Sequence, residues 1–193
     1  MGLPFFLTKY FKKVTLKQNE FTKLKGKSTM FHIVLVEPEI PQNTGNIART
    51  CAATGCVLHL VKPLGFEISD KQLRRAGLDY WHLVKVVVHD SFDEVLASAE
   101  KEARFFYFTT KAPRAYTEAS FQKGDYLVFG RETKGLPEEL LVQHKEECVR
   151  IPMSEESRSL NLSNSVAIAV YEGLRQNDFE GLLESGQLHR LHW

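Results

Sequence analysis

Cysteine is scarce in this sequence. The 193 residues contain three cysteines, Cys51, Cys56 and Cys148, and no CxxC pair or His/Cys cluster at ligand spacing. An odd number of cysteines without such spacing argues against a disulfide framework and against a zinc site. We therefore expect reduced thiols in a cytoplasmic protein that binds no metal.

Long hydrophobic runs are absent as well. A helix that spans a bilayer needs about 20 consecutive apolar residues, whereas runs such as residues 33–36 and 166–170 have the length of buried strands or core helix segments. A secretory signal is not predicted, because the apolar run at residues 3–7 is short and contains Pro4. We therefore expect no membrane insertion.

Acidic and basic residues are unevenly distributed. Residues 1–29 contain seven lysines, one acidic residue and no arginine, which gives +6, whereas the other 18 basic and 23 acidic residues give −5. A net charge of −5 over residues 30–193 is not typical of a nucleic-acid-binding protein. RNA contact would need a local basic patch, two patches pooled in a dimer, or the N-terminal segment. We interpret residues 1–29 as a basic N-terminal extension, either a tail or a sequence translated upstream of a natural start at Met30.

Residues 30–193 read as one domain in which strands alternate with helices. Short apolar runs predict strands at residues 31–36, 57–61, 84–88, 104–110, 125–130 and 147–152, and helices are expected near residues 43–55, 70–82, 91–102, from Pro137 onward, and over 161–176. This alternation predicts an α/β fold, a mostly parallel sheet with flanking helices. No GxGxxG follows the first strand, so a nucleotide-dependent oxidoreductase is not supported.

Capping signals predict where two of these helices begin. Asn43 or Thr44 is expected to cap the first helix, which should end at Gly55. Ser91 and Glu94 have the spacing of a capping box at the start of the helix over 91–102.

Two loops carry residues suited to binding. In residues 43–50, Gly45 allows close backbone approach and Arg49 offers a planar fork for phosphate, although a capped helix with a surface arginine explains them equally well. In residues 129–137, two glycines bracket charged residues between a strand and a helix, where binding loops are common but plain connections occur too.

A third loop is the strongest indication of a site. Four serines and two asparagines fall within residues 157–165, at the start of an apolar helix. Capping that helix requires one or two of them, so the others are available to bind a ligand. Ligands of parallel sheets lie beyond the carboxyl ends of the strands, where all three loops are expected.

Three segments resemble, in order along the chain, the three motifs of the SPOUT class of RNA methyltransferases. They are NTGNIART (43–50), FGRETKGLP (129–137) and IPM…SRSLNLSNSVAIAVYE (151–172). Within the SPOUT class, residues 30–183 are most similar to the small bacterial TrmL (YibK-like) family. Further matches to this family are EPEIP, LRRAGLDYW and TTKAP. The resemblance implies a deep trefoil knot at the C-terminal end and a homodimer formed through the knot and the C-terminal helix.

The resemblance also implies an activity. TrmL-like enzymes use S-adenosylmethionine, with S-adenosylhomocysteine as product, to methylate the ribose 2′-hydroxyl of the wobble nucleotide 34, a cytidine or modified uridine. Their partner is the anticodon stem-loop of tRNA. Two alternatives stay open. One is the same chemistry on another RNA such as rRNA, and the other is a non-catalytic RNA-binding protein with this fold.

Site residues are carried over by motif. The resemblance implies cofactor binding by Phe108, Thr109, Gly130, Glu132, Ile151, Ser159 and Leu160, and it makes Asn43 and Ser163 candidates for orienting the substrate or Arg49. Arg74, Arg75 and Arg131 are instead candidate substrate contacts because of their charge, with a solvated surface charge as the alternative for each. The resemblance also implies a catalytic role for Arg49. Because an arginine is effectively always protonated, we favour Arg49 as a clamp on the flanking phosphate over Arg49 as a general base.

Overall fold

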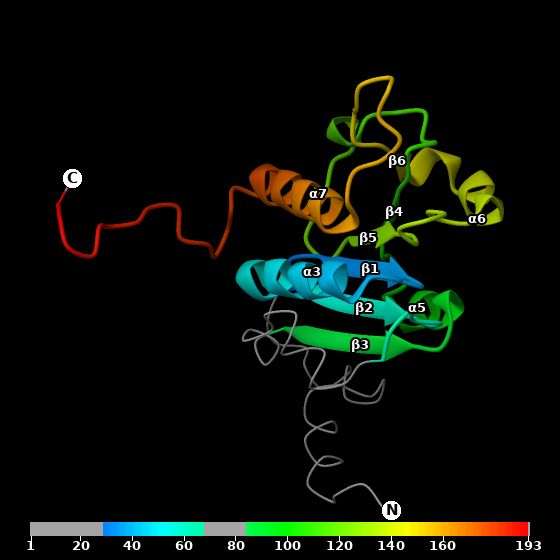
Figure 1. The fold of residues 1–193 in the computed structure, drawn as a ribbon, viewed down its shortest axis with the longest axis horizontal. Helices are drawn as coiled ribbons and strands as arrows, with labels where there is room; N and C mark the ends of the chain where they lie inside the picture. The colour runs from blue at the N-terminus through cyan, green and yellow to red at the C-terminus, as the bar shows by residue number, and fades with distance from the viewer. Residues whose placement is uncertain (1–28, 68–83, 193) are drawn as a thin grey trace, which may run out of the picture.

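The structure, a computed structural model, describes residues 29–67 and 84–192. Its centre is a six-stranded sheet in the order β3-β2-β1-β5-β4-β6, with every neighbouring pair parallel. The strands are β1 (His32–Val36), β2 (Val57–Val61), β3 (Lys85–His89), β4 (Phe105–Phe108), β5 (Tyr126–Phe129) and β6 (Cys148–Val149). The predicted α/β class with a parallel sheet is therefore confirmed (Figure 1).

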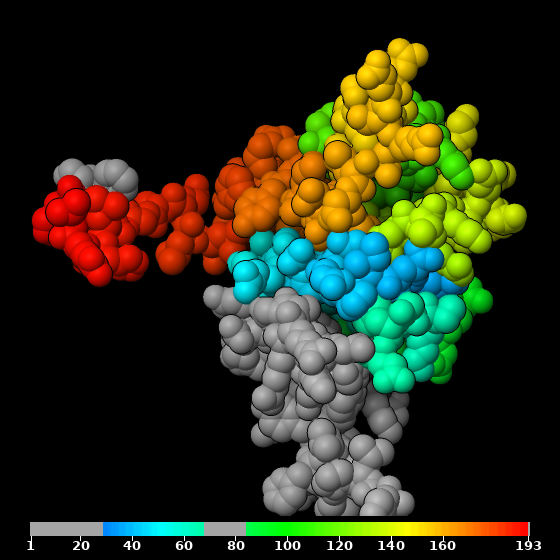
Figure 2. All heavy atoms as spheres, in the orientation of Figure 1, coloured from blue at the N-terminus to red at the C-terminus, as the bar shows by residue number. Residues whose placement is uncertain are grey.

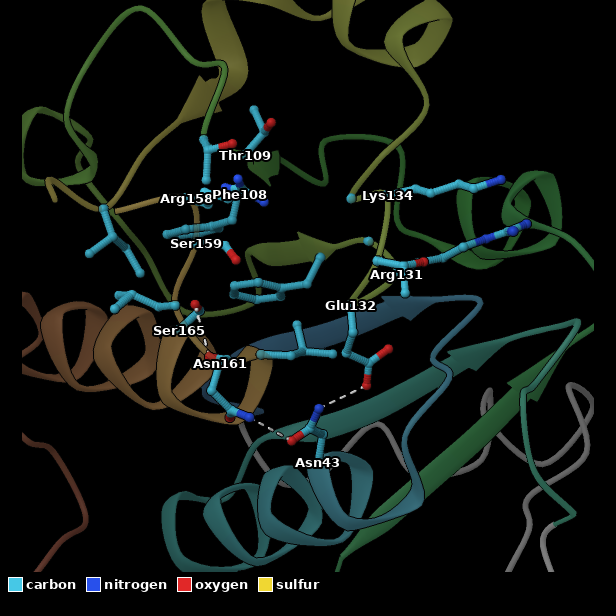
Figure 3. Close-up of a pocket in the computed structure, with 18 of the residues that line it drawn as sticks. Asn43, Phe108, Thr109, Arg131, Glu132, Lys134, Arg158, Ser159, Asn161 and Ser165 are labelled. Atoms are coloured by element: carbon cyan, nitrogen blue, oxygen red, sulfur yellow. Dashed lines mark hydrogen bonds between the residues drawn. The ribbon is translucent and has the colours of Figure 1, made fainter. Parts of the chain in front are cut away.

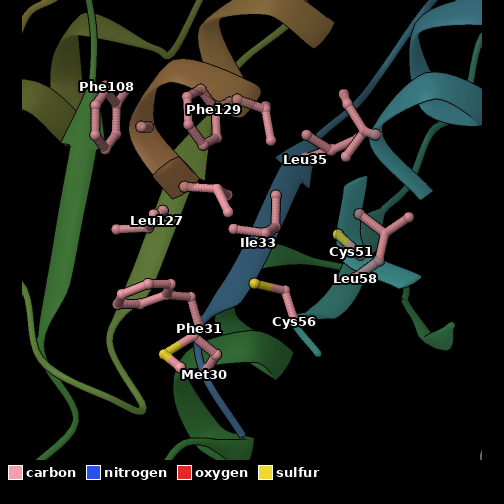
Figure 4. Close-up of a cluster of buried hydrophobic side chains, with 14 of the residues drawn as sticks. Met30, Phe31, Ile33, Leu35, Cys51, Cys56, Leu58, Phe108, Leu127 and Phe129 are labelled. Carbon is pink, nitrogen blue, oxygen red and sulfur yellow. The ribbon is translucent and has the colours of Figure 1, made fainter. Parts of the chain in front are cut away.

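Helices cover both faces of this sheet because successive strand residues point to opposite sides. Ile33 and Leu35 of β1 belong to the cluster that includes residues of α3 (Pro41–Thr54) and α7 (Leu162–Gln176), part of which Figure 4 shows. Val34 belongs to the cluster beneath α5 (Phe92–Ser98) and α6 (Glu138–Gln143). β1 is thus buried throughout, as its continuous apolar sequence predicts.

The end of the chain leaves this body. Phe179 and Leu182, shortly after α7, still pack against the core, and residues 183–192 extend away from the packed domain (Figure 2). Within residues 29–67 and 84–192, no helix has the length and apolar character needed to cross a bilayer.

Strand bounds follow the predictions with small shifts. The strand over 57–61 is confirmed, and the one predicted over 84–88 lies one residue later. The last strand was predicted over 147–152 but comprises only Cys148–Val149. Arg150 leaves the sheet to form a single bridge with Ala115, and Pro152 has no N–H to extend the ladder.

The predicted cap of the first helix is wrong. α3 begins at Pro41, with Ile40 at the cap position and no side-chain cap. Proline suits the first turn because its missing N–H would have no helical partner there. Asn43 lies within α3 and is buried, and its side-chain amide donates a hydrogen bond to Glu132 instead. The predicted end is confirmed, since Gly55 closes α3 in the left-handed conformation with φ 71°.

α5, α6 and α7 each begin one residue after the predicted first residue of their helix. Ser91 caps α5 and accepts the backbone N–H of Glu94, but the Glu94 carboxylate accepts from Asp90 rather than from Ser91. α5 also ends at Ser98 instead of 102. Pro137 occupies the cap position of α6 rather than its first helical position. The one-residue differences at the helix starts fall within the usual uncertainty of helix ends, whereas the earlier end of α5 at Ser98 does not.

Three buried histidines connect the strands on one side of the sheet. His32 Nδ1 lies 2.8 Å from His59 Nε2, and His59 Nδ1 lies 2.9 Å from His89 Nε2. A neutral imidazole has one donor and one acceptor nitrogen, so three neutral rings can satisfy both contacts. Burial lowers the pKa of His32 from 6.5 to about 4, with Lys85 as a second cause, and burial also lowers the pKa of His59 and of His89.

These histidines predict acid lability. Because their folded-state pKa values are depressed, the unfolded chain binds more protons, and stability is lost as the pH falls from about 6.5 toward 4. A shift of this size at His32 alone corresponds to about 3 kcal/mol. Urea unfolding between pH 7.5 and 5 should show this loss, with a shallower pH slope in His59→Gln than in the exposed control His192→Gln. Equal slopes in both variants would contradict the prediction.

Candidate active site

A cavity of about 510 Å³ opens beside the carboxyl ends of the central strands (Figure 3). Its walls come from residues 40 and 43 after β1, 108–111 at the end of β4, 129–135 after β5, and 151–165 after β6. The strand order places β1, β5, β4 and β6 side by side, so loops far apart in sequence meet here. The volume is in the range of small-molecule sites, about 300–1,000 Å³.

Most residues singled out from the sequence line this cavity. They are Asn43, Phe108, Thr109, Gly130, Arg131, Glu132, Ile151, Ser159 and Leu160. Arg49 and Ser163 are not among the lining residues. Arg49 is exposed farther along α3, and the Ser163 hydroxyl donates to the Asn161 side chain at 2.7 Å. Arg74 and Arg75 lie outside the described residues.

The cavity has apolar walls. Phe108 stacks on Phe129 with ring centroids 4.8 Å apart, which fixes one wall. Ile151 is half-buried, and Leu160 is 38% exposed although it is a large apolar side chain. Such walls can sandwich a planar heterocycle while neighbouring backbone N–H and C=O groups bond to its edge.

The loop after β5 is a tight hairpin that only glycine permits. Gly135 donates its N–H to the Arg131 carbonyl at 2.9 Å and has φ +69°. A Cβ on Gly130 would lie 2.1 Å from the carbonyl carbon of Gly135 and 2.3 Å from the Leu136 nitrogen. These are backbone atoms, which cannot rotate away as a side chain could. The shape of this wall therefore depends on Gly130.

Glu132 joins the second loop to the first. Its carboxylate accepts the backbone N–H groups of Glu39 at 2.8 Å and Ile40 at 3.1 Å, and the Asn43 side-chain amide at 2.9 Å. The Glu132 carboxylate therefore accepts hydrogen bonds from the N–H groups just before α3 and from Asn43. Because the Asn43 side chain bonds to Glu132, Asn43 is not the helix cap. Both carboxylate oxygens of Glu132 are engaged with the protein, so its contribution to the cavity is to hold the loops together.

Asn161 adds the third loop to the same network. Its Nδ2 donates to Asn43 Oδ1 at 3.0 Å, while its Oδ1 accepts the N–H groups of Ser163 and Asn164 and caps α7 (Figure 3). The sequence placed Asn161 in the polar loop but did not single it out. The sequence feature that could have identified Asn161 was the surplus of polar side chains at the start of α7. Asn161 uses its side chain both to cap α7 and to bond to Asn43.

The family described as SpoU rRNA Methylase matches residues 30–171. This chain belongs to the SpoU methylase family. A tRNA (cytidine(34)-2'-O)-methyltransferase of Methylovorus glucosotrophus is 54% identical over 153 residues, covering 79% of this chain and 99% of that relative. A solved structure described by the phrase "Structural insights into the 2-OH methylation of C/U34 on tRNA" is 48% identical, with a TM-score of 0.75. It covers 80% of this chain and 100% of that one.

A more distant structure shares the fold. The SpoU methyltransferase AviRb of Streptomyces viridochromogenes, solved in complex with AdoMet, is 21% identical with a TM-score of 0.71, covering 81% of this chain and 61% of that one. The SpoU family assignment therefore rests on the family match and the near relatives, and the fold assignment also holds at low identity.

Charged residues surround the SpoU-family cavity. Lys111 pairs with Glu138 at 2.6 Å, while Lys134 and Arg158 are exposed at the rim. Arg131 pairs with Glu37, which follows β1 and has a left-handed φ of 53°. Sequence reasoning missed Glu37, because its partner lies on a different loop of the fold.

Proposed function

We propose that this protein transfers a methyl group from S-adenosylmethionine to the ribose 2′-hydroxyl of nucleotide 34, the wobble position, of tRNA. The observation that carries the proposal is the meeting of the three motif loops at one cavity, in a chain of the SpoU family. The name of the Methylovorus relative and the description of the 48% identical structure support this substrate and position. A tRNA substrate also implies a cytoplasmic protein.

The residues of the cavity fit this cofactor. Phe108, Ile151 and Leu160 supply apolar walls for adenine, and the absence of a side chain at Gly130 lets the backbone of the hairpin pack closely against this wall. When bound, S-adenosylmethionine supplies an electrophilic methyl group on a positively charged sulfur and leaves as S-adenosylhomocysteine. The AdoMet complex of AviRb supports the same cofactor. The backbone that builds this cavity is, by resemblance, the deep trefoil knot of the SPOUT class.

The chain contributes mainly by positioning. Methyl transfer requires the ribose oxygen and the methyl carbon to be held about 3–3.5 Å apart, and a hydroxyl must lose or share its proton as it reacts. Asn43, Glu132 and Asn161 fix α3, which carries Arg49, to the loops of the cofactor cavity. In our proposal Arg49 binds the phosphate beside the target nucleotide, and the hydroxyl proton passes to that phosphate or to water.

Arg49→Lys tests this role. Because a lysine keeps the positive charge but loses the planar fork, we expect methylation to fall roughly tenfold, with cofactor affinity unchanged. Initial rates with saturating S-adenosylmethionine and varied tRNA provide the measurement. Complete loss of activity with unchanged binding of cofactor and tRNA would favour Arg49 as a general base instead.

A homodimer is part of the proposal. α7 is largely apolar, and its Tyr171 is 51% exposed in the single chain. A second copy would cover this face and bring one subunit's basic residues beside the other's cofactor. Light scattering should give twice the chain mass of 22.1 kDa. Tyr171→Glu should return the mass of one chain, whereas Val142→Glu, at a 79% exposed position of α6, should not.

The deciding experiment uses labelled S-adenosylmethionine with unmodified bulk tRNA, and with ribosomal RNA in a parallel reaction. Label on the ribose of nucleotide 34 after digestion supports the proposal. Label that enters only ribosomal RNA would favour the alternative substrate. Bound cofactor with no label would point to a missing earlier modification or another RNA, and no cofactor binding would favour a non-catalytic RNA-binding protein.

A further inference from the structure

Glu37 has an unusual backbone conformation for its residue type. It follows β1 directly, and its φ of 53° lies in the left-handed region, which glycine, asparagine and aspartate adopt far more readily than glutamate. Its N–H is fixed to the Val61 carbonyl at 2.9 Å, so the conformation is held by the neighbouring strand. Residues held in this way cluster at functional sites, and the Glu37 side chain contacts Arg131, which lines the cavity.

The side chain of Glu37 crosses to the loop after β5. Its carboxylate pairs with a terminal nitrogen of Arg131, and the two side chains are 24% and 36% exposed. Partly exposed ion pairs contribute little to stability, so this contact does not offset the cost of a left-handed glutamate. The pair is better explained by where it places Arg131.

A second contact in the same register steadies this placement. Two residues beyond Glu37, the Glu39 carboxylate accepts the Thr133 N–H at 3.1 Å and the Thr133 hydroxyl at 2.8 Å. Residues 37–39 after β1 and residues 131–133 after β5 therefore contact each other twice. Glu37 pairs with Arg131, and Glu39 accepts from Thr133. Arg131 is therefore held both through its side chain and through its loop.

Arg131 faces away from the apolar wall of the cavity. In Figure 3 its side chain and that of Lys134 extend from the hairpin away from Phe108 and Ser159. A guanidinium has five N–H donors in a rigid fork and can bind a carboxylate on one edge and a phosphate on another. In a chain whose residues 30–193 carry −5, a fixed arginine beside the cofactor cavity is a suitable contact for an RNA backbone.

We propose that Glu37 is a positioning residue that holds Arg131 at the cavity rim as a contact for an RNA backbone phosphate near the methylated ribose. This inference rests on the proposed function. It assigns the left-handed Glu37 a role that acts only through Arg131, so removing either residue should remove the same interaction.

A double-mutant cycle of Glu37→Gln, Arg131→Ala and the double variant tests this directly. We expect each single variant to weaken tRNA binding about five- to tenfold and to reduce the slope of log affinity against log salt by roughly one. The double variant should be no worse than Arg131→Ala alone. S-adenosylmethionine affinity should stay within threefold of wild type, and Glu102→Gln, an exposed control, should match wild type.

Three results would overturn the proposal. A Glu37→Gln effect that persists in full in the Arg131→Ala background would mean that Glu37 does not act through Arg131. Tighter tRNA binding by Glu37→Gln would mean that the carboxylate competes with RNA for the arginine. An unchanged salt slope with weaker binding would indicate a merely structural pair. Failure of wild type to methylate tRNA would instead count against the proposed function.

Discussion

Gly130→Ala should abolish measurable cofactor binding at ordinary concentrations, weakening S-adenosylmethionine affinity by at least about 100-fold. The added Cβ would lie 2.1 Å from the Gly135 carbonyl carbon, far inside any contact distance for a real Cβ atom. The hairpin must therefore shift, and an active-site displacement of about 1 Å is enough to cost 100-fold. Calorimetric titration of the purified variant provides the measurement.

A matched glycine separates this effect from a general loss of folding. Gly186 lies in the extended C-terminal segment, has no positive φ, and has no atom within 4 Å of the place that an added Cβ would take, so Gly186→Ala should bind cofactor as wild type does. Circular dichroism should show both variants folded at room temperature. Cofactor affinity of Gly130→Ala within threefold of wild type would contradict the role of Gly130 in the cavity wall.

Glu132→Gln should lower methylation on the order of 100-fold, because the isosteric amide cannot reproduce the carboxylate's contacts. The carboxylate accepts from two backbone N–H groups and from Asn43, whereas an amide turns an NH₂ group toward one of these donors. Leaving a part-buried donor without an acceptor costs about 1–3 kcal/mol. The loss of activity should appear in kcat, since the hydrogen bonds of Glu132 hold α3 and the loop after β5 in their relative positions.

Glu139→Gln is the control for this substitution, because Glu139 is exposed on α6 and does not line the cavity. The second measurement is an Asn161→Ala variant, which removes the other partner of Asn43. If the three loops act as one network, Asn161→Ala and Glu132→Gln should combine to less than the sum of their separate effects. Full additivity, or normal activity of Glu132→Gln, would contradict the network.

Local sequence patterns were sufficient for the elements themselves. Strands such as β2 were predicted at their observed bounds because a strand buried on both faces is a continuous apolar run. Gly55 was predicted as a helix end because the left-handed cap there suits glycine. Caps were less predictable, since Asn43 had the composition of a helix cap but a stronger partner in Glu132.

The sequence by itself determined the α/β class, the three loops and, through their motifs, the family. Only the tertiary structure decided which side chains meet. The Asn43–Glu132 and Asn43–Asn161 hydrogen bonds join residues 89 and 118 positions apart, and the histidine contacts join residues 27 and 30 apart. No local periodicity encodes such pairs, because they depend on the strand order. That order places β5 beside β1, where the loops after the strands meet, and it places β1, β2 and β3 side by side, where the histidines meet.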